Sequence, residues 1–356
     1  MIEVNAENVI DYLLTTGSSV AESVGTPPDE LKHAQAAELA WGVSNIVLRI
    51  DTPERSFVVK QSRKQLRTQI DWFSQLERIW RETDALRALQ RLLPAGAAPR
   101  VLAENRNNYL FVMEAIEADH RVWKAELLAG NFDVEIARKL AGHLAVIHRG
   151  STGDVLIAEQ LADRDIFDEL RLDPFYRYVA ERNSLLQAPL LSLIEDTLAR
   201  RDCLVLADFS PKNILLTSGD PVLVDFETAH VGDPAFDLGF FLSHLLLKAV
   251  FHHQRLAQVM ELPRVFWLEY VSRLGDSPAP EWLIDPARSP GFERQCVRHL
   301  GACMLARIDG KSCVDYLTAA WQPELVRRYC HRLLCEPLAS MPDAFDLLID
   351  ELGRST

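Results

Sequence analysis

The sequence lacks the features that would place the protein in a membrane or on a nucleic acid. None of its apolar runs approaches the roughly 20 consecutive residues that a membrane helix needs. Its first residues, MIEVNAENVIDYLL, contain no basic segment followed by an apolar one, so we expect no secretory signal. The 51 acidic residues outnumber the 38 basic ones, and a net charge of −13 argues against a nucleic-acid surface. We also find no internal repeat and no low-complexity run.

Cysteine is scarce, and its spacing is not that of a metal site. No pair has the CxxC spacing, and five of the six cysteines fall in the last quarter of the chain, at intervals natural for buried helix positions. They are Cys203, Cys296, Cys303, Cys313, Cys330 and Cys335. We therefore expect reduced thiols in the core of a cytoplasmic protein, rather than zinc ligands or disulfides.

The pattern of apolar residues predicts two parts of different character. Before residue 113, two β-rich runs separated by DTPER indicate a hairpin over 41–62, and a helical pattern follows over 69–93. Two more short strands are expected over 98–116. Later segments such as EIARKLAGHLAVIHRG are mainly helical. We expect an α+β protein with a small lobe, 1–113, containing an antiparallel sheet plus one helix, and a larger, mainly helical lobe, 114–356, joined by a connection at about 113–117.

Polar side chains follow two neighbouring β-like runs in the larger lobe. LADFSPKNILL, at 206–216, places Asp208 and Asn213 between apolar residues, and VLVDFETAH, at 222–230, ends its run with Asp225 and Glu227. Two interpretations are open from the residues alone. The pattern is typical of a β-hairpin with polar turns, where a lone Asp before a proline stabilises the turn. It is equally typical of a catalytic loop followed by a metal loop.

Phosphoryl transfer is the chemistry that needs these residue types at this spacing. It requires an oriented hydroxyl group, a hard metal ion against the phosphates and a cation that anchors them. Asp208 would accept the proton of the hydroxyl, and Asn213 would supply a neutral oxygen to Mg²⁺. Asp225 would provide the charged metal ligand. Glu227 points to the same side of an extended segment and would bind a second metal ion or a metal-bound water.

These motifs resemble the aminoglycoside phosphotransferase/choline kinase superfamily, small-molecule relatives of the protein kinases. The family pattern H-G-D-x-x-x-x-N, followed by a strand, D-x-E/D and G-D-P-x-x-D-L, is similar to 206–239 here, and in outline the similarity covers about residues 35–250. The resemblance implies a bilobal, protein-kinase-like fold and an enzyme that uses ATP and Mg²⁺. The implied acceptor is a small-molecule hydroxyl of the sugar, amino alcohol or aminoglycoside class.

The resemblance also assigns residues upstream. VVKQ supplies a strand lysine, Lys60, for the phosphates, and the helical ERIWRETDALRAL supplies its partner. We predict Glu82 as that partner rather than Glu77, which faces differently on the same helix. Ser44 lies in the segment similar to the nucleotide-covering loop. The backbone of Glu114 and Ile116, in the segment similar to the hinge, would meet the adenine edge.

Other details are closest to methylthioribose kinase-like bacterial small-molecule kinases, with two departures. The family of methylthioribose kinases carries an Arg pair at about the position of Arg307, which Ile308 follows here, so we assign Arg307 a role in substrate binding without assigning the substrate. Leu206 and Ala207 replace the usual His-Gly before Asp208, which removes a polar partner. We expect Ala207 to have ordinary backbone angles.

Three further residues have expected supporting roles, and the functional interpretation has an alternative. Asp233 is expected to cap the following helix or to shape the metal loop, and Asp237 to hold the catalytic-loop backbone. His148 is expected to close its helix or to form hydrogen bonds behind that loop. The alternative to a kinase is a nucleotide-binding regulator with a degenerate kinase fold. Partners beyond a small-molecule substrate are not expected, apart from a homodimer, which the sequence leaves open.

Overall fold

The computed structural model describes residues 1–39, 45–65, 74–275, 280, 289–336, 338 and 340–355. Within these residues the chain forms two compact units. The first consists of Met1–His120 together with Val222–Glu227, and the second consists of Arg121–Pro221 and Thr228–Thr356. The sequence placed the connection at about 113–117 and did not indicate that Val222–Glu227 belongs with the N-terminal residues. This segment carries two of the predicted metal ligands into the first unit.

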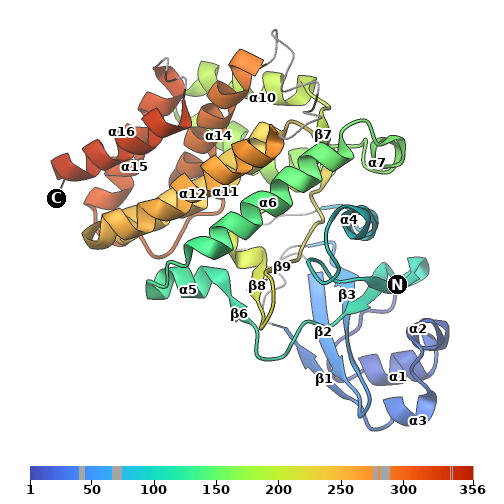
Figure 1. Cartoon of the computed structure of the whole chain (residues 1–356). Coiled ribbons are helices and arrows are strands. Elements are labelled where there is room, and N and C mark those ends of the chain that lie inside the picture. The colour runs from blue at the N-terminus through green and yellow to red at the C-terminus, as the bar shows by residue number, and fades with distance from the viewer. Residues whose placement is uncertain are drawn as a thin grey trace. The chain divides into compact units, whose positions relative to one another are not determined.

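The first unit is built around a five-stranded antiparallel sheet with the strand order β1-β2-β3-β5-β4 (Figure 1). Its strands are β1 (Gln35–Glu38), β2 (Asn45–Asp51), β3 (Ser56–Ser62), β4 (Val101–Asn105) and β5 (Leu110–Glu114). The predicted hairpin is present as β2 and β3, paired from Asn45 opposite Ser62 to Asp51 opposite Ser56. The short strand β9 (Val222–Leu223) also belongs to this unit, where the Leu223 N–H donates to the Ala97 carbonyl.

Helices cover both faces of this sheet. Alternate residues Ile46, Leu48 and Ile50 of β2 join a buried apolar cluster with α1 (Val9–Leu14), α2 (Ser18–Val24) and α3 (Pro28–Leu31), which the sequence did not predict. Successive side chains of a strand point to opposite faces, so Lys60 of β3 projects to the other face, towards α4 (Arg78–Leu92).

Helix α4 begins at Arg78, later than the helical pattern suggests. Of the residues expected before it, 66–73 lie outside the described residues, and 74–77 are not helical. The guanidinium of Arg78 donates to the Gln75 carbonyl at 2.7 Å. The Gln75 carbonyl, just before the helix, therefore accepts its hydrogen bond from a side chain rather than from a helical N–H group.

The second unit consists mainly of helices (Figure 1). Its longer helices are α5 (Trp123–Ala129), α6 (Val134–Ser151), α10 (Gln187–Ala199), α11 (Pro234–Phe251), α12 (Leu256–Leu274), α14 (Ser289–Asp309), α15 (Trp321–Cys335) and α16 (Met341–Ser355). Shorter elements are α7 (Val155–Gln160), α8 (Asp165–Phe167), a π-helix (Asp168–Arg177), α9 (Tyr178–Arg182) and a 3₁₀ turn (Pro211–Asn213). Two short antiparallel pairs are formed by β6 (Arg121–Val122) with β8 (Ile214–Leu216) and by β7 (Cys203–Val205) with β10 (His230–Gly232).

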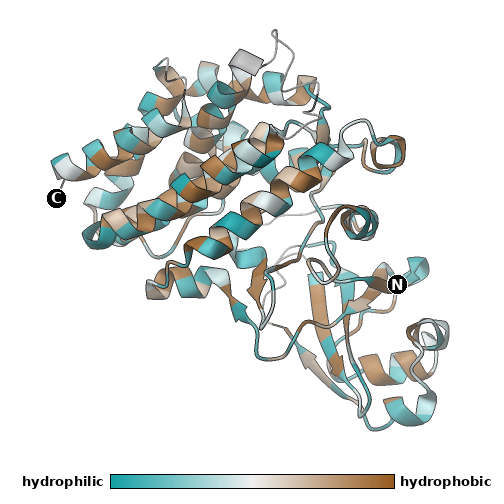
Figure 2. Ribbon diagram, viewed as in Figure 1, coloured by the Kyte–Doolittle hydropathy of each residue, from teal (hydrophilic) through white to brown (hydrophobic). Residues whose placement is uncertain are grey.

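Helix α11 is the core helix of the second unit. It packs against α12 and α14, and its residues from Pro234 to Val250 are all buried. At Gly239 a Cβ atom would lie 2.6 Å from the backbone of His299 and Leu300, so this glycine allows α11 and α14 to approach closely. By length and composition α11 could cross a membrane, but its burial is that of a core helix. Helices nearer the surface, such as α6, alternate polar and apolar residues instead (Figure 2).

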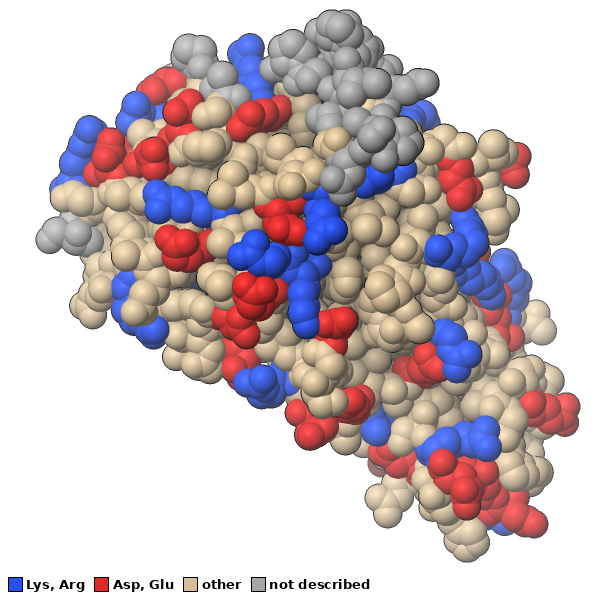
Figure 3. All heavy atoms as spheres, viewed as in Figure 1, with Lys and Arg blue, Asp and Glu red and all other residues tan. Residues whose placement is uncertain are grey.

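Charged side chains are mixed on the surface. On the face drawn in Figure 3, basic and acidic groups lie interspersed rather than gathered in one basic area. Many of them form ion pairs, such as Arg273 with Glu269 and Arg332 with Glu336. None of the six cysteines forms a disulfide in the structure, and four of them are buried.

Candidate active site

The first unit holds a buried lysine between two carboxylates. The Nζ atom of Lys60 lies 2.7 Å from Oε2 of Glu82 and 2.8 Å from Oδ1 of Asp225. Burial disfavours the ammonium ion, but the neighbouring carboxylates of Asp225 and Glu82 outweigh that effect and raise the pKa of Lys60. Lys60 is therefore a fixed cation. For Glu82, burial raises the pKa, and the attraction of Lys60 opposes the shift.

The predicted ion pair of Lys60 with Glu82 is confirmed by these distances. Glu82 lies on α4 and is 1% exposed, so its carboxylate faces the sheet. Glu77 instead precedes the helix, is exposed, and accepts a hydrogen bond from the Tyr109 hydroxyl at 3.3 Å. The helix start at Arg78 separates the two glutamates, because it leaves Glu77 outside α4 and places Glu82 on the buried face of the helix.

Asp225 has an unusual backbone conformation. Its φ angle is +72°, in the left-handed region that costs a non-glycine residue about 1–2 kcal/mol. Asp tolerates this region better than most residues because its short side chain can form local hydrogen bonds. The strained backbone orients a carboxylate that is 28% exposed at its side chain, whereas Glu82 and Lys60 are almost fully buried. Asp225 is thus the accessible member of the group.

Glu227 is bound by two other side chains of the first unit. Its Oε2 atom accepts hydrogen bonds from Nδ2 of Asn45 at 2.9 Å and from Nε of Arg78 at 3.1 Å. Arg78 is completely buried, so it needs a carboxylate partner. In this arrangement Glu227 neutralises Arg78, and its predicted role as a second metal ligand stays a prediction.

The structure describes two of the three residues predicted to contact the nucleotide outside the phosphates, Glu114 and Ile116. The N–H of Glu114 donates to the Arg100 carbonyl at 3.0 Å, and its carboxylate forms an ion pair with the Arg100 side chain. The carbonyl of Ile116 accepts a hydrogen bond from Arg49 at 2.7 Å. Ser44 lies outside the described residues. The adenine contacts of Glu114 and Ile116 therefore stay predictions.

In the second unit, Asp208 is surrounded by donors. Nη2 of Arg171 lies 2.8 Å from its Oδ1, while Nζ of Lys212 lies 2.9 Å and Nδ2 of Asn213 lies 2.8 Å from its Oδ2. Asp208 is 6% exposed. A carboxylate has about four lone-pair positions. Three donors therefore leave about one position open for a hydroxyl group.

Asn213 is oriented by the same loop. Its Nδ2 atom donates to both the carbonyl and the carboxylate of Asp208, at 3.0 Å and 2.8 Å. Since the amide nitrogen is fully used, the side-chain oxygen points away from Asp208 as an acceptor. A neutral oxygen of this kind is one of the hard oxygen ligands that Mg²⁺ prefers, and in the first unit the carboxylate of Asp225 is another. Mg²⁺ usually takes only one or two carboxylates and completes its shell with phosphates and water.

Sequence reasoning missed Arg171. This residue lies in the π-helix Asp168–Arg177, and its Nε atom donates to the Ala207 carbonyl at 2.6 Å while its Nη2 atom binds Asp208. It therefore holds the backbone and the side chain of the predicted catalytic loop together. The one signal in the sequence is Pro174, a proline inside the segment that forms the π-helix. π-Helical turns are rare in proteins, and those that occur often lie at functional sites.

The Leu206–Ala207 pair is held by the surrounding structure. Oδ2 and Oδ1 of Asp237 accept the N–H groups of Leu206 and Ala207, each at 2.7 Å, and the Leu206 carbonyl accepts from Thr228. The expectation of ordinary backbone angles at Ala207 was wrong, because its φ is +58°. The hydrogen bonds of Asp237 and Arg171 outweigh the cost of the left-handed conformation, so the loop keeps a glycine-like shape without glycine.

The supporting residues lie where they were expected. Asp233 caps α11, since its Oδ1 accepts the Ala235 N–H at 3.0 Å and Pro234 occupies the first helical position. His148 lies behind the loop, 3.3 Å from Oδ2 of Asp237 and 2.7 Å from the Tyr270 hydroxyl. The buried carboxylate of Asp237 is therefore fully engaged.

Arg307 lies near the end of α14. Its Nη1 donates to the Ser312 hydroxyl at 2.7 Å, and its buried Nε has no hydrogen-bond partner among the described residues. Burial lowers its pKa, while Tyr316 and then Asp208 act in the opposite direction, so Arg307 is within electrostatic range of Asp208. Its role in substrate binding stays a prediction.

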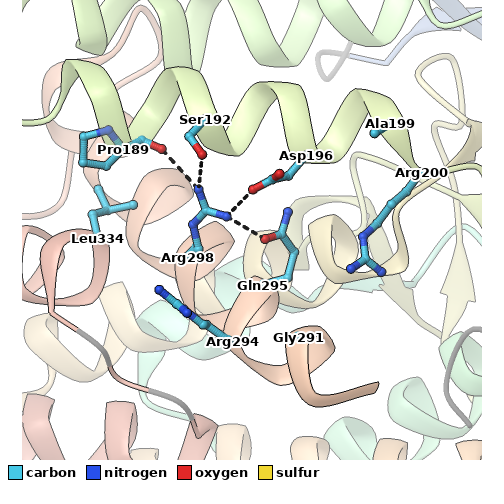
Figure 4. Close-up of a pocket in the computed structure, with 10 residues that line it drawn as sticks. All are labelled: Pro189, Ser192, Asp196, Ala199, Arg200, Gly291, Arg294, Gln295, Arg298 and Leu334. Atoms are coloured by element: carbon cyan, nitrogen blue, oxygen red, sulfur yellow. Dashed lines mark hydrogen bonds and ion pairs between the residues drawn. The ribbon is translucent and has the colours of Figure 1, made fainter. Parts of the chain in front are cut away.

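A pocket of about 570 Å³ lies elsewhere in the second unit, between α10 and α14 (Figure 4). Arg298 on its wall is already bound by Asp196 at 2.5 Å and by Gln295 at 3.0 Å. Neither Asp208 nor Asn213 lines it. Its size is therefore no argument for locating the chemistry there.

Known proteins share this sequence pattern and this fold. The chain is 25% identical to a methylthioribose kinase of Exiguobacterium sibiricum over 267 residues, which cover 67% of each protein. It is also 25% identical to a methylthioribose kinase of Yersinia pestis over an alignment of 367 residues, covering 88% of this chain and 87% of the relative. Both similarities extend well beyond the loop around Asp208.

Solved structures support the fold. An ethanolamine kinase of Plasmodium vivax superimposes with a TM-score of 0.53 at 12% identity, covering 98% of this chain and 86% of the other. An amicoumacin kinase in complex with AMP-PNP, Ca²⁺ and Ami gives a TM-score of 0.53 at 15% identity, covering 90% and 92%. The predicted kinase-like α+β fold is thereby confirmed.

The sequence profile of one family matches the segment that carries both groups of residues. That segment, residues 35–261, makes up more than half of the chain, and the family is described as the phosphotransferase enzyme family. The chain therefore belongs to the phosphotransferase enzyme family and is a small-molecule kinase.

Proposed function

We propose that the protein transfers the γ-phosphate of ATP to a hydroxyl group of a small molecule of the sugar, amino alcohol or aminoglycoside class, with Mg²⁺ as the metal cofactor. The observation that carries the proposal is the buried carboxylate of Asp208, held by Arg171, Lys212 and Asn213 with about one acceptor position open. Phosphoryl transfer asks the protein mainly for positioning and for charge stabilisation.

The residues of the first unit would bind the nucleotide. Lys60 is a compact cation that Glu82 holds in place, and it would bind the α- and β-phosphates. Asp225 would offer its accessible carboxylate to Mg²⁺, and Asn213 of the second unit would offer its amide oxygen. When bound, Mg²⁺ neutralises charge on the phosphate oxygens. Ser44, Glu114 and Ile116 would contact the rest of the nucleotide.

The residues of the second unit would act on the acceptor. Asp208 would accept a hydrogen bond from the hydroxyl group and then its proton. The acceptor oxygen forms a bond to the γ-phosphorus, the bond from that phosphorus to the β–γ bridging oxygen breaks, and ADP leaves. Arg171 and Lys212 hold the carboxylate of Asp208 in place, which keeps it ready to orient the hydroxyl group.

Two observations bear on the identity of the acceptor, and they point in different directions. The relatives named methylthioribose kinases support a sugar. In contrast, Ile308 after Arg307 departs from the Arg pair that the resemblance to that family implies. A regulator with a degenerate kinase fold would not need the complete set of Lys60, Glu82, Asp208 and Asp225 in paired positions.

The test is ADP formation over a panel of sugars, amino alcohols and aminoglycosides. We expect Asp208→Asn to lower kcat about 100-fold or more with the best acceptor, because general-base residues contribute about 10²–10⁴. Asp220→Asn, which changes an exposed carboxylate paired with Lys139, is the matched control and should retain activity. Undiminished turnover in Asp208→Asn would show that this assignment is wrong. Binding of ATP and Mg²⁺ without turnover on any acceptor would support the regulator.

A further inference from the structure

Three side chains, those of Phe240, His244 and Lys248, form a row on one face of α11, and the row begins near Arg171, the partner of Asp208. Phe240, His244 and Lys248 are spaced four residues apart, so they lie on the same side of the helix. The guanidinium of Arg171, which binds Asp208, lies 5.6 Å from the Phe240 ring centroid, and the rings of Phe240 and His244 are 5.0 Å apart. A continuous path of contacts thus runs from the predicted base to His244.

The row ends at a buried cation without a counter-ion. Lys248 is 1% exposed, and its Nζ atom donates to the His244 carbonyl at 3.1 Å and lies 5.6 Å from the Tyr316 ring centroid. No carboxylate among the described residues forms an ion pair with Lys248, Arg307 or Lys124. An unpaired buried ammonium is costly, so proteins rarely keep one without a function.

Three polar atoms beside this lysine are also buried and have no hydrogen-bond partner in the part of the chain that the structure describes. They are Nε2 of His244, which is 8% exposed, Nε of Arg307 and the hydroxyl of Tyr316. These groups interact electrostatically with one another: Arg307, Lys248, Lys212 and Lys124 all lower the pKa of His244, although burial is the larger cause. These groups are therefore within electrostatic range of His244, and one of them is Lys212, which binds Asp208.

Two acidic residues of the same unit that could meet a cationic acceptor are already paired. Glu269 binds Arg273 at 2.8 Å, and Asp309 binds Arg327 at 2.7 Å, so both are already neutralised. Glu261 is exposed on α12. Asp315 acts electrostatically on Tyr316, but Lys248, Arg307 and Lys124 have no ion-pair partner among the described residues, so charge complementarity favours a negative ligand.

We propose that the acceptor of this kinase carries an anionic group, a carboxylate or a phosphate ester, that binds to Lys248 and Arg307 with hydrogen bonds to His244 and Tyr316. This inference rests on the proposed phosphotransfer, and it names the chemical class of the acceptor. The anion supplies the counter-ion that the buried cations lack. The hydroxyl group of the same molecule then lies at Asp208, which Lys212 and Arg307 connect electrostatically to the anion site.

Acceptors that share a skeleton and differ in one charge test the inference. Suitable sets are glucose, gluconate, glucose 6-phosphate and glucosamine, and glycerol, glycerate, glycerol 3-phosphate and serinol. We expect the carboxylate or the phosphate member of a set to give the highest kcat/KM in ADP formation. Comparing these two members shows whether the site prefers a carboxylate or a phosphate ester. A neutral or cationic member that exceeds both anionic members in kcat/KM would overturn the inference.

Substitutions of the two proposed cations test where the anionic group of the acceptor binds. Lys248→Met and Arg307→Met should each raise KM for the anionic acceptor at least about tenfold, as expected for lost charge-assisted hydrogen bonds, with KM for ATP unchanged. Lys139→Met, which removes an exposed lysine of α6 paired with Asp220, is the control and should leave both values unchanged. Equal KM values in Lys248→Met and wild type would place the acceptor elsewhere.

A binding measurement separates this inference from the proposed reaction. Calorimetry with malonate or inorganic phosphate on the ADP-saturated enzyme should show a site that is lost in Lys248→Met and kept in Lys139→Met. If anions bind in this way while no acceptor is phosphorylated, the anion site stands and the proposed reaction fails. If phosphorylation is observed and anion binding is the same in Lys248→Met as in wild type, the anion site is wrong and the reaction stands.

Discussion

Asp237 fixes the backbone of Ala207 by accepting its N–H group at 2.7 Å, in a conformation with φ of +58°. The same carboxylate accepts the Leu206 N–H, and it is completely buried with His148 behind it. A buried carboxylate needs several donors, and the strained loop supplies two of them. The Leu-Ala pair therefore does not loosen the loop that carries Asp208. Its shape comes from Asp237 and Arg171 rather than from the residue types in the loop.

Replacing Ala207 by glycine should not destabilise the protein. The left-handed conformation costs alanine about 1–2 kcal/mol and costs glycine almost nothing, which offsets the larger entropy of an unfolded chain with glycine. We expect the free energy of unfolding of Ala207→Gly to be unchanged or about 0.5–1 kcal/mol higher. Chemical denaturation measures it. In the control Ala158→Gly, at an exposed position of α7, glycine should cost about 0.5–1 kcal/mol, so similar losses at both sites would contradict the prediction.

Arg171 should act as a positioning residue. Arg171→Lys keeps the charge but cannot bind the Ala207 carbonyl and the Asp208 carboxylate through one planar group. We expect a loss of roughly 10- to 100-fold in kcat for Arg171→Lys and Arg171→Met, as for a displaced catalytic group, with KM for ATP little changed. Steady-state kinetics measures both values. Arg177→Met, in the same π-helix and paired with Asp168, is the control. A loss confined to KM for ATP would show that Arg171 acts elsewhere.

Glu82 and Glu77 offer a direct comparison on neighbouring turns. Glu82→Gln removes the charge that holds Lys60, so kcat/KM for ATP should fall at least about tenfold, the equivalent of about 1.4 kcal/mol. Glu77→Gln changes an exposed residue whose carboxylate accepts a hydrogen bond from the Tyr109 hydroxyl, and it should leave kcat/KM unchanged. Equal effects of the two substitutions would remove the basis for pairing Lys60 with Glu82.

Lys248, the proposed anion-binding residue, should lower the free energy of unfolding when no ligand is bound. Burial, with Lys124 and Arg307 adding to it, lowers the pKa of Lys248 to about 7 from 10.5. Between these values the unfolded chain binds more protons than the folded one, so this contribution makes stability rise with pH from about 7 to about 10.5. Lys248→Met should therefore be more stable than wild type at pH 7, on the order of 2–4 kcal/mol, with the difference shrinking as pH rises. Urea denaturation at pH 7 and pH 9 measures it, and a less stable Lys248→Met would contradict it.

The same pKa gives a pH dependence of acceptor use. Lys248 faces Lys124 of α5, Arg307 of α14 and Tyr316, beside His244 on its own helix, and it binds an anion best when charged. For a carboxylate acceptor, which stays ionised over this range, kcat/KM should decrease as pH rises above about 7. The decrease should be absent in Lys248→Met. A profile that is identical in both proteins would assign the titration to another group.

The fold was largely predictable from local patterns. The β2–β3 hairpin follows from alternating apolar residues around a proline-containing turn, and the core helix α11 follows from its dense apolar pattern. The three N-terminal helices α1–α3 were missed because they are short, with 6, 7 and 4 residues, and carry little periodicity. The membership of Val222–Glu227 in the first unit has no local signal, because it depends on contacts with distant residues such as Lys60 and Arg78.

The sequence by itself predicted which residues carry the chemistry. The spacing of Asp208, Asn213 and Asp225 predicts phosphoryl transfer because each side chain has one chemical role at a fixed distance along the chain. Only the tertiary structure decided how these groups are held. The contacts of Arg171 with Asp208 and the unpaired Lys248 on α11 arise from packing between segments far apart in sequence. Burial and charge pairing are properties of that packing, so residue types and periodicity do not specify them.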